Sequence, residues 1–537
     1  IFDTIWQAAD ERYACFQNLD LDWQAIRDKY RPEIEQGVSR GRFAAILNYM
    51  MMSLREAHTV AWDTLVFGAT KPGPGIPLIN LGVAWRDNRL FGACITPLPD
   101  SSLVVYSVVP NHPLALEPGD ILLGYNGIPW KILYRELLRT ELPIADYGWG
   151  GSESAFHHSW LVSAGMNWHL FDTIDIVKYH SGDTLHLPVQ TLAQTSSACT
   201  FCTEQLPVPN VPFPDQVNGD YVSWGIVDDT NIGYVYVRSW IHGEPHQQFG
   251  NAIDSLMNVL KVDGLIIDYR NNEGGYPMSA DRGYALLFNT RIETMYFAER
   301  SDPRDHFAMT IKASPLHYGT IPGNPSSYFD KPIAVLTGPG AVSAGDYNAF
   351  KMKFHARARL FGKPTAASYS AAWPVELSNP EYFAVISDYN VSRLDSPTVF
   401  LSHSELEIDF PVWLTRDDIA RGEDTVVKSA LAWIQGQNTA VSETPVTASP
   451  LTLNLLQNYP NPFNPSTEIA FTISSPQHVT LEIFDMNGRK TTVLLSGKLP
   501  AGRHRLTWKP ENLASGVYIY RIQAGNAVTA RKMIFLQ

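Results

Sequence analysis

Residues 333–350 read IAVLTGPGAVSAGDYNAF, and residues 264–275 read GLIIDYRNNEGG. In the first stretch the apolar run Ile333–Thr337 leads through a Gly-Pro-Gly turn to Ser343, and an apolar-periodic segment follows. A short apolar run bounded by turns is typical of a buried strand in a parallel or mixed sheet, and the periodic segment predicts a helix. The sequence therefore predicts an α/β unit with Ser343 at a strand-to-helix junction.

A serine at such a junction lies where unpaired backbone N–H groups and the helix dipole favour negative charge. Those donors could hold an oxyanion, and the N–H of Ala344 is the natural candidate. Serine is also a preferred helix N-cap, so this segment alone leaves a capping role open.

The second stretch runs from a predicted buried strand, Leu265–Asp268, into Gly274 and Gly275. Paired glycines permit positive φ and let the backbone approach a ligand closely, although an ordinary glycine turn has the same composition. Asp268 and Arg270 alternate at the end of the apolar strand, and we expect them to pair structurally.

The two stretches, in this order, resemble the serine peptidases of the C-terminal processing and tricorn-core family. The resemblance implies a crotonase/Clp-like α/β peptidase core over residues 200–437. It implies that Ser343 is the nucleophile and that Ala344, with Gly274 or Gly275, lines the oxyanion hole.

The family divides over the base that activates the serine. One branch uses a lysine after a Gly-x-x-Thr turn, but here Gly362-Lys363-Pro-Thr365 is followed by Ala366-Ala-Ser368. The tricorn-like branch uses a histidine from the N-terminal helical region, and Ser53-Leu-Arg-Glu-Ala-His58-Thr is similar to that motif. A neutral imidazole can accept the serine proton and later protonate the leaving amine. The resemblance therefore implies His58 as the base and disfavours a Ser–Lys dyad.

The third catalytic member is less well marked. The family places a carboxylate near the end of the catalytic domain, where this chain reads Leu401-Ser-His-Ser-Glu405-Leu-Glu407 without the family spacing. We expect Glu405 to orient His58, with Glu56, Glu407 and Ser402 as competing candidates.

Residues 1–70 have helix-like spacing of apolar residues, and residues 75–195 contain short strands and turns. Within the latter, PGDILLGYNG (residues 118–127) resembles a PDZ domain, which binds peptide termini at a sheet edge. That resemblance implies substrate recruitment or gating. A β domain without a ligand is the alternative, because the insertion after Trp130 could block the groove.

A Thr/Ser/Pro-bearing stretch, residues 438–451, is predicted to be a linker, and residues 452–537 an immunoglobulin-like β-sandwich. Residues 458–469 (NYPNPFNPSTEI) and 515–521 (SGVYIYR) resemble the C-terminal sorting domain of the type IX secretion system. The resemblance implies that this machinery is a partner and that the protein is secreted or placed on the cell surface.

The net charge is −13, from 41 Lys/Arg and 54 Asp/Glu. Residues 451–537 carry nine basic and four acidic residues (+5), which leaves −18 on the first 450 residues. An acidic body argues against nucleic acid as the main partner, and no apolar run reaches the ~20 residues that span a bilayer. The unlike charges indicate two modules with different roles.

Four cysteines are too few for a disulfide framework, and Cys199-Thr-Phe-Cys202 could be a redox motif, half a zinc site or a local disulfide. The pairs His157–His158 and His242/His246 lack completing metal ligands. We expect neither a metal nor a cofactor. The sequence predicts an exported serine endopeptidase acting on peptides or unfolded protein, with a non-catalytic binding protein or a small-molecule esterase as alternatives.

Overall fold

The computed structural model divides the chain into two compact units, Ile1–Thr439 and Ala440–Gln537. The residues it describes are 1–68, 79–80, 91–146, 150–165, 167–194, 202–215, 218–241, 243–315, 317–439, 453–455, 458, 463–473, 476–485, 489–500, 502–510, 513–525 and 527–535. The predicted strand Leu81–Trp85 lies outside the described residues.

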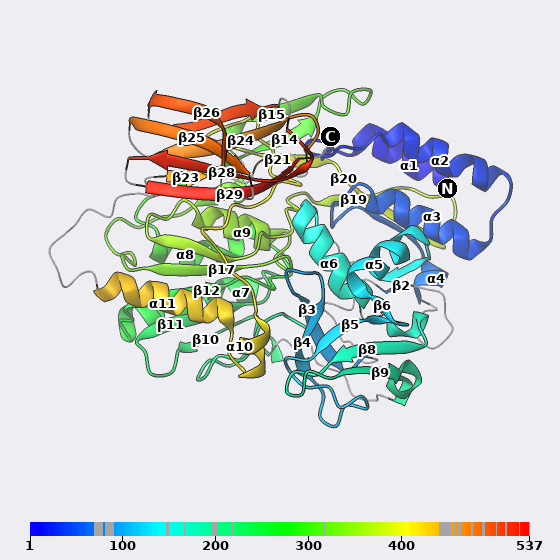
Figure 1. The fold of residues 1–537 in the computed structure, drawn as a ribbon, viewed down its shortest axis with the longest axis horizontal. Coiled ribbons are helices and arrows are strands. Elements are labelled where there is room, and N and C mark those ends of the chain that lie inside the picture. Colours follow the sequence, from blue (N-terminus) through cyan, green and yellow to red (C-terminus); the bar gives the residue numbers. More distant parts are fainter. Residues whose placement is uncertain are drawn as a thin grey trace. The chain divides into compact units, whose positions relative to one another are not determined.

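The first unit is centred on a sheet of strand order β10-β11-β12-β17-β18-β22 (Figure 1). Neighbouring strands from β11 to β22 are parallel, and only β10 runs antiparallel to its neighbour. Every residue of β12 and β17 is buried, which confirms the prediction of buried parallel strands. The bounds are β10 Val222–Ile226, β11 Ile232–Val237, β12 Gly264–Asp268, β17 Ile333–Thr337, β18 Ala358–Gly362 and β22 Phe410–Pro411.

Helices cover both faces of this sheet, because alternate strand residues point to opposite sides. On one face Leu265 and Val335 pack in a cluster with Phe249, Tyr284 and Tyr347. These three residues belong to α7 (Gly243–Asp254), α8 (Asp281–Leu287) and α9 (Ala344–Met352). On the other face Ile266, Ala334 and Leu336 pack with Val426, Ala430 and Ile434 of α11 (Thr425–Thr439). Helix α11 therefore extends into the first residues of the predicted linker.

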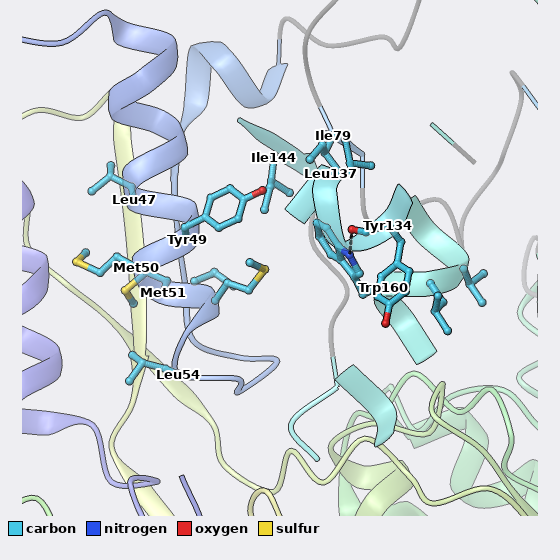
Figure 2. Close-up of a cluster of buried hydrophobic side chains, with 14 of the residues drawn as sticks. Leu47, Tyr49, Met50, Met51, Leu54, Ile79, Tyr134, Leu137, Ile144 and Trp160 are labelled. Carbon is cyan, nitrogen blue, oxygen red and sulfur yellow. Dashed lines mark hydrogen bonds between the residues drawn. The ribbon is translucent and has the colours of Figure 1, made fainter. Parts of the chain in front are cut away.

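The N-terminal segment forms α1 (Phe2–Arg12), α2 (Trp23–Glu35) and α3 (Arg40–Met52), as the periodicity predicts. It is not a separate body, since its apolar residues and those of the following β region form one core cluster. Figure 2 shows α3 side chains such as Tyr49 and Met51 in this cluster, which also contains Leu137 and Trp160. Strand β1 (Val60–Asp63) then pairs with β20 (Tyr382–Ser387), which follows it by more than 300 residues in the sequence.

The β region has the strand order β3-β4-β5-β8-β9, with β6 paired to β5. Its bounds are β3 Ala93–Pro97, β4 Leu103–Val108, β5 Ile121–Tyr125, β6 Ile128–Pro129, β8 Thr173–Val177 and β9 Thr184–Pro188. Two helices pack on it, α5 (Trp130–Arg139) and α6 (Glu153–Gly165). Helix α6 lies within the insertion after Trp130, and its helical conformation was not predicted from the sequence.

A disulfide joins Cys94 of β3 to Cys202 in the segment that leads to the central sheet. Cys202 is therefore not paired with Cys199, which lies outside the described residues. Smaller sheets flank the centre, in the orders β15-β14-β21, β1-β20-β19, β13-β16 and β2-β7. The remaining bounds in this unit are α4 Thr64–Gly68, α10 Arg416–Ala420, β2 Ile79–Asn80, β7 Ile144–Asp146, β13 Ile292–Glu293, β14 Met295–Arg300, β15 Met309–Pro315, β16 Thr320–Ile321, β19 Ala372–Pro374 and β21 Tyr389–Arg393.

The second unit consists of two antiparallel sheets, β23-β24-β27 and β26-β25-β28-β29. Phe471 from the first sheet and Leu481 and Tyr520 from the second lie in one core cluster, so the two sheets pack face to face. The bounds are β23 Leu453–Leu455, β24 Thr467–Ile473, β25 Gln477–Asp485, β26 Lys490–Leu499, β27 Gly502–Trp508, β28 Gly516–Ala524 and β29 Ala527–Phe535.

Candidate active site

Ser343 lies between β17 and α9 in a backbone conformation that non-glycine residues rarely adopt, with φ 58° and ψ −117°. Strained positions of this kind cost about 1–3 kcal/mol and persist only when their surroundings hold them. Here the N–H of Ser343 donates to Asp346 Oδ2 at 2.8 Å. The sharp turn leaves the Ser343 side chain partly exposed, as a nucleophile requires.

Asp346 is fully buried and holds more than the serine turn. Its Oδ1 accepts the N–H of Ala367 at 2.7 Å, and its Oδ2 accepts that of Ser368 at 3.1 Å. Burial raises the pKa of Asp346 to about 6, against the opposing effect of these donors. Sequence reasoning missed this residue, although a carboxylate three residues after an N-cap serine is a known helix-start pattern.

The first glycine of the pair, Gly274, lies directly against Ser343. A Cβ placed on Gly274 would come within 2.8 Å of the Ser343 Cβ and within 3.4 Å of the Ala344 nitrogen. Both glycines have positive φ, 87° and 124°. The structure thus brings together the two sequence stretches and allows no side chain at Gly274.

Backbone donors are present around this contact. Within the described part of the chain, the N–H groups of Ala344 and Gly275 have no acceptor, whereas the N–H of Gly274 donates to Asn272 Oδ1 at 3.1 Å. The N–H groups at the start of α9 and in the glycine turn are therefore those available to a developing oxyanion.

His58 lies in the turn after α3 and is held by a carboxylate of the same turn. Glu56 Oε1 is 3.0 Å from His58 Nδ1, and Glu56 Oε2 accepts the N–H of His58 at 2.7 Å. Glu56 is itself fully buried, and Ser387 Oγ of β20 donates to it at 2.8 Å. Because Glu56 occupies Nδ1, the other ring nitrogen is left as the proton acceptor.

Electrostatics favour the charged form of His58. Burial opposes that form, but the attraction and hydrogen bond of Glu56, with a contribution from Asp346, raise the pKa of His58 above its ordinary 6.5. Among the described residues no hydrogen bond joins Ser343 Oγ to His58. A chain of hydrogen bonds connects the two turns: the N–H of Ala57, next to His58, donates to Ser368 Oγ. The N–H of Ser368 in turn donates to Asp346, which holds the Ser343 turn.

Among the described residues, Glu405, the predicted orienter, has no hydrogen bond to His58. It is exposed, and its carboxylate accepts the N–H and the hydroxyl of Ser154 at 2.9 and 2.6 Å. Glu56, one of the competing candidates, is the carboxylate that contacts the imidazole. The prediction of Glu405 is corrected for this reason.

The three lysines that follow Ser343 most closely in the sequence have other partners. Lys363 Nζ is 3.1 Å from His158 Nδ1, and the other ring nitrogen of His158 contacts Glu204 at 2.8 Å. Burial lowers the pKa of Lys363 to about 8. Lys351 contacts the carbonyl of Pro277, and Lys353 contacts Glu407.

The expected structural pairing of Asp268 with Arg270 is confirmed, at 2.7 Å between Oδ2 and Nη2. Arg270 also contacts Asp424 at 2.8 Å, and Asp424 caps the start of α11 through the N–H of Val426. The network is fully buried and fixes the strand end that leads to the glycine turn.

In the described ranges no group of three or more His, Cys, Asp or Glu side chains could hold a metal ion, and His242 lies outside these ranges. Likewise, the described part of the chain contains no helix long and apolar enough to cross a membrane.

Comparison with known families gives three matches along the chain. Residues 1–52 match the tricorn protease C1 domain, residues 231–392 match peptidase family S41, and residues 457–536 match the secretion system C-terminal sorting domain. No curated protein matches the chain.

Solved structures of mature CPAF share the fold at low sequence identity. Mature CPAF is 14% identical with a TM-score of 0.57 over 83% of this chain and 97% of that one. A complex of mature CPAF with lactacystin is 13% identical with a TM-score of 0.56 over 82% and 97%. A putative peptidase from Parabacteroides merdae is 15% identical with a TM-score of 0.47 over 82% and 97%.

Proposed function

We propose that the chain, which contains a peptidase family S41 domain, is a serine peptidase with Ser343 as its nucleophile and His58 as its general base. The observation that carries the proposal is the contact of Gly274 with the strained Ser343 turn. The same helix start supplies an unpaired N–H, and the Glu56-bound imidazole lies within the electrostatic reach of Asp346.

In the proposed reaction His58 takes the Ser343 proton as Oγ attacks the peptide carbonyl. The resulting imidazolium is stabilised by Glu56, and the N–H groups of Ala344 and Gly275 donate to the oxyanion. The imidazolium then protonates the leaving amine, which gives an acyl-enzyme. Water attacks this ester with His58 again as base, and Ser343 recovers its proton.

The 91–194 region resembles a PDZ domain in sequence, and we propose that it positions the catalytic elements instead of recruiting peptide termini. Helix α6 packs against α5 and against β3, and β3 is an edge strand of the sheet, to which a peptide could add. A Cβ on Gly165 of α6 would meet Leu103 at 2.3 Å and Ile95 at 3.3 Å, and Trp130 Nε1 of α5 donates to the carbonyl of Leu161.

The C-terminal unit gives the setting of this activity. Residues 457–536 are a sorting domain, which directs the chain through type IX secretion to the cell surface or the medium. We propose that the substrates are peptides or unfolded proteins outside the cell.

The test is hydrolysis of an unfolded protein by purified variants. We expect Ser343→Ala to lose activity on the order of 10³-fold or more, and His58→Ala nearly as much, with unchanged thermal unfolding. Lys363→Met should retain activity. Undiminished turnover by Ser343→Ala would refute the proposal, and an inactive Lys363→Met beside an active His58→Ala would favour a Ser–Lys dyad.

A further inference from the structure

A pocket of about 560 Å³ lies at the carboxyl ends of β11 and β12, where Val237, Arg238 and Asn271 line it. Ligands of parallel sheets bind at this end of the strands, and the volume is in the range of small-molecule and peptide subsites. Its walls are mainly apolar, with Tyr106, Leu206, Phe213, Tyr236 and Ile419 as the large contributors. Nothing in the reaction described above uses this pocket.

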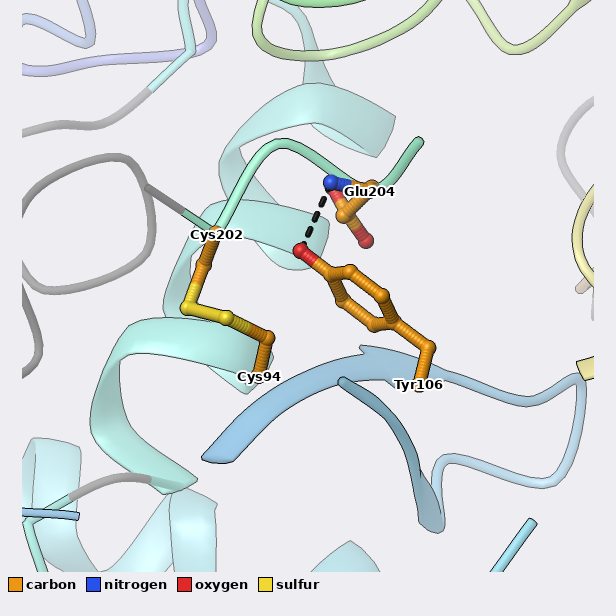
Figure 3. Close-up of a disulfide and its surroundings, with 4 residues drawn as sticks. All are labelled: Cys94, Tyr106, Cys202 and Glu204. Atoms are coloured by element: carbon orange, nitrogen blue, oxygen red, sulfur yellow. Dashed lines mark hydrogen bonds between the residues drawn. A yellow bond between two sulfur atoms is a disulfide. The ribbon is translucent and has the colours of Figure 1, made fainter. Parts of the chain in front are cut away.

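One wall of the pocket is fixed before any ligand binds. The segment that carries Leu206 and Phe213 begins at Cys202, whose disulfide to Cys94 anchors it to the β region. Figure 3 shows the N–H of Glu204 donating to the hydroxyl of Tyr106, at 2.7 Å, beside this disulfide. Preformed walls reduce the entropy cost of binding.

The polar groups of the pocket indicate what it accepts. Arg238 and Asp215 place opposite charges on the wall of the pocket, and Arg238 already forms an ion pair with Glu273 at 2.8 Å. We therefore expect the pocket to bind a neutral group. Asn271 also lines the pocket, but it is only 5% exposed and adds little polar surface to the wall.

The pocket is within reach of the nucleophile along one short loop. Asn271 lines it, and Gly274, three positions later, touches Ser343. Three extended residues span about 10 Å. The Arg238–Trp240 segment runs alongside, since the Arg238 carbonyl accepts the N–H of Glu273 and the Trp240 N–H donates to the Gly274 carbonyl.

We propose that this pocket is a substrate subsite. It takes a large apolar or aromatic side chain of an extended peptide, about three residues from the scissile bond. The inference rests on the proposed function, because it places the scissile bond at Ser343.

The test compares a filled and an enlarged pocket. Ser107 is exposed at the pocket edge, so Ser107→Trp would fill the space, and Phe213→Ala would remove a partly exposed wall. Phe307→Ala, at a 64% exposed position away from the pocket, is the matched control. Cleavage products of a peptide library, identified by mass spectrometry, report the preference at each position. A single-residue p-nitrophenyl ester reports Ser343 without occupying the pocket.

We expect the wild type to prefer Phe, Tyr or Leu over Ala and Asp at one position about three residues from the cleaved bond. Both pocket variants should weaken that preference about tenfold while ester hydrolysis and the Phe307→Ala profile stay unchanged. An unaltered preference in both pocket variants, or no preference in the wild type, would overturn the subsite. Absence of ester hydrolysis by the wild type would instead overturn the proposed function, and the subsite with it.

Discussion

At the scale of single residues, the site depends on two buried carboxylates with different tasks. Asp346 holds the strained backbone of Ser343, and Glu56 holds the imidazole of His58. The motifs predicted Ser343 and His58, but the choice among four candidates for the orienter depended on how residues 53–59 turn. In the folded turn Glu56 reaches both the N–H and the Nδ1 of His58, two residues away, and Glu405 is held by Ser154.

The role of Glu56 leads to a prediction about pH. Glu56 raises the pKa of His58, which must be neutral to act as base, so activity should rise with pH through a value above 6.5. In Glu56→Gln only Asp346 would still oppose the effect of burial on the pKa of His58, and the acidic limb of kcat/KM should move to lower pH. The variant should also lose kcat on the order of a hundredfold, since the imidazolium loses its partner.

Glu405→Gln is the matched control for this pH profile, because its carboxylate is exposed and contacts Ser154. It should reproduce the wild-type profile of hydrolysis against pH. A shifted profile in Glu405→Gln with a normal one in Glu56→Gln would reverse the assignment.

At the scale of elements, the start of α6 connects the β region to the catalytic turn. The N–H of Gly151 donates to the carbonyl of Ala366, and His403 Nδ1 contacts the carbonyl of Gly151 at 3.0 Å. Arg55, three residues before His58, forms an ion pair with Glu153. The strands and α9 were predictable from apolar runs, whereas α6 was not, because its contacts come from segments distant in the sequence.

A substitution at Gly151 should therefore impair catalysis from outside the site. A Cβ there would lie 2.7 Å from the Ala367 carbonyl oxygen and 3.0 Å from that of Arg55, and backbone atoms cannot move aside cheaply. We expect Gly151→Ala to lower kcat on the order of tenfold or more by displacing these segments.

Gly436→Ala is the control, at a helical position where a Cβ would meet nothing within 4 Å. It should leave kcat unchanged, and the unfolding temperature should stay the same or rise slightly, because alanine favours the helical conformation over glycine. Equal activity of the two variants in peptide hydrolysis would show that α6 does not support the site.

At the scale of the whole molecule, the chain consists of a catalytic unit and a sorting unit. The charge difference and the tail motif predicted this division. The sequence predicted two separate segments, residues 1–70 and residues 75–195, whereas both belong to one compact unit. The pattern of apolar residues marks the buried face of an element but does not reveal which other element packs against it. The two segments share one core, and β1 pairs with β20.

Removal of residues 440–537 should leave the catalytic unit intact, since units with their own cores fold independently. We expect a chain ending at Thr439 to hydrolyse peptides within about twofold of the full chain and to be retained inside a host with type IX secretion. Loss of activity on truncation, or export without the tail, would contradict this division of roles.

The most direct test of the central claim is the rate of covalent labelling by a fluorophosphonate, followed by mass spectrometry of the labelled peptide. The account predicts one adduct, on Ser343, in the wild type. It also predicts a rate on the order of 10²-fold lower in His58→Ala and no adduct in Ser343→Ala. An unlabelled wild type, or labelling of Ser343 at an unchanged rate in His58→Ala, would contradict it.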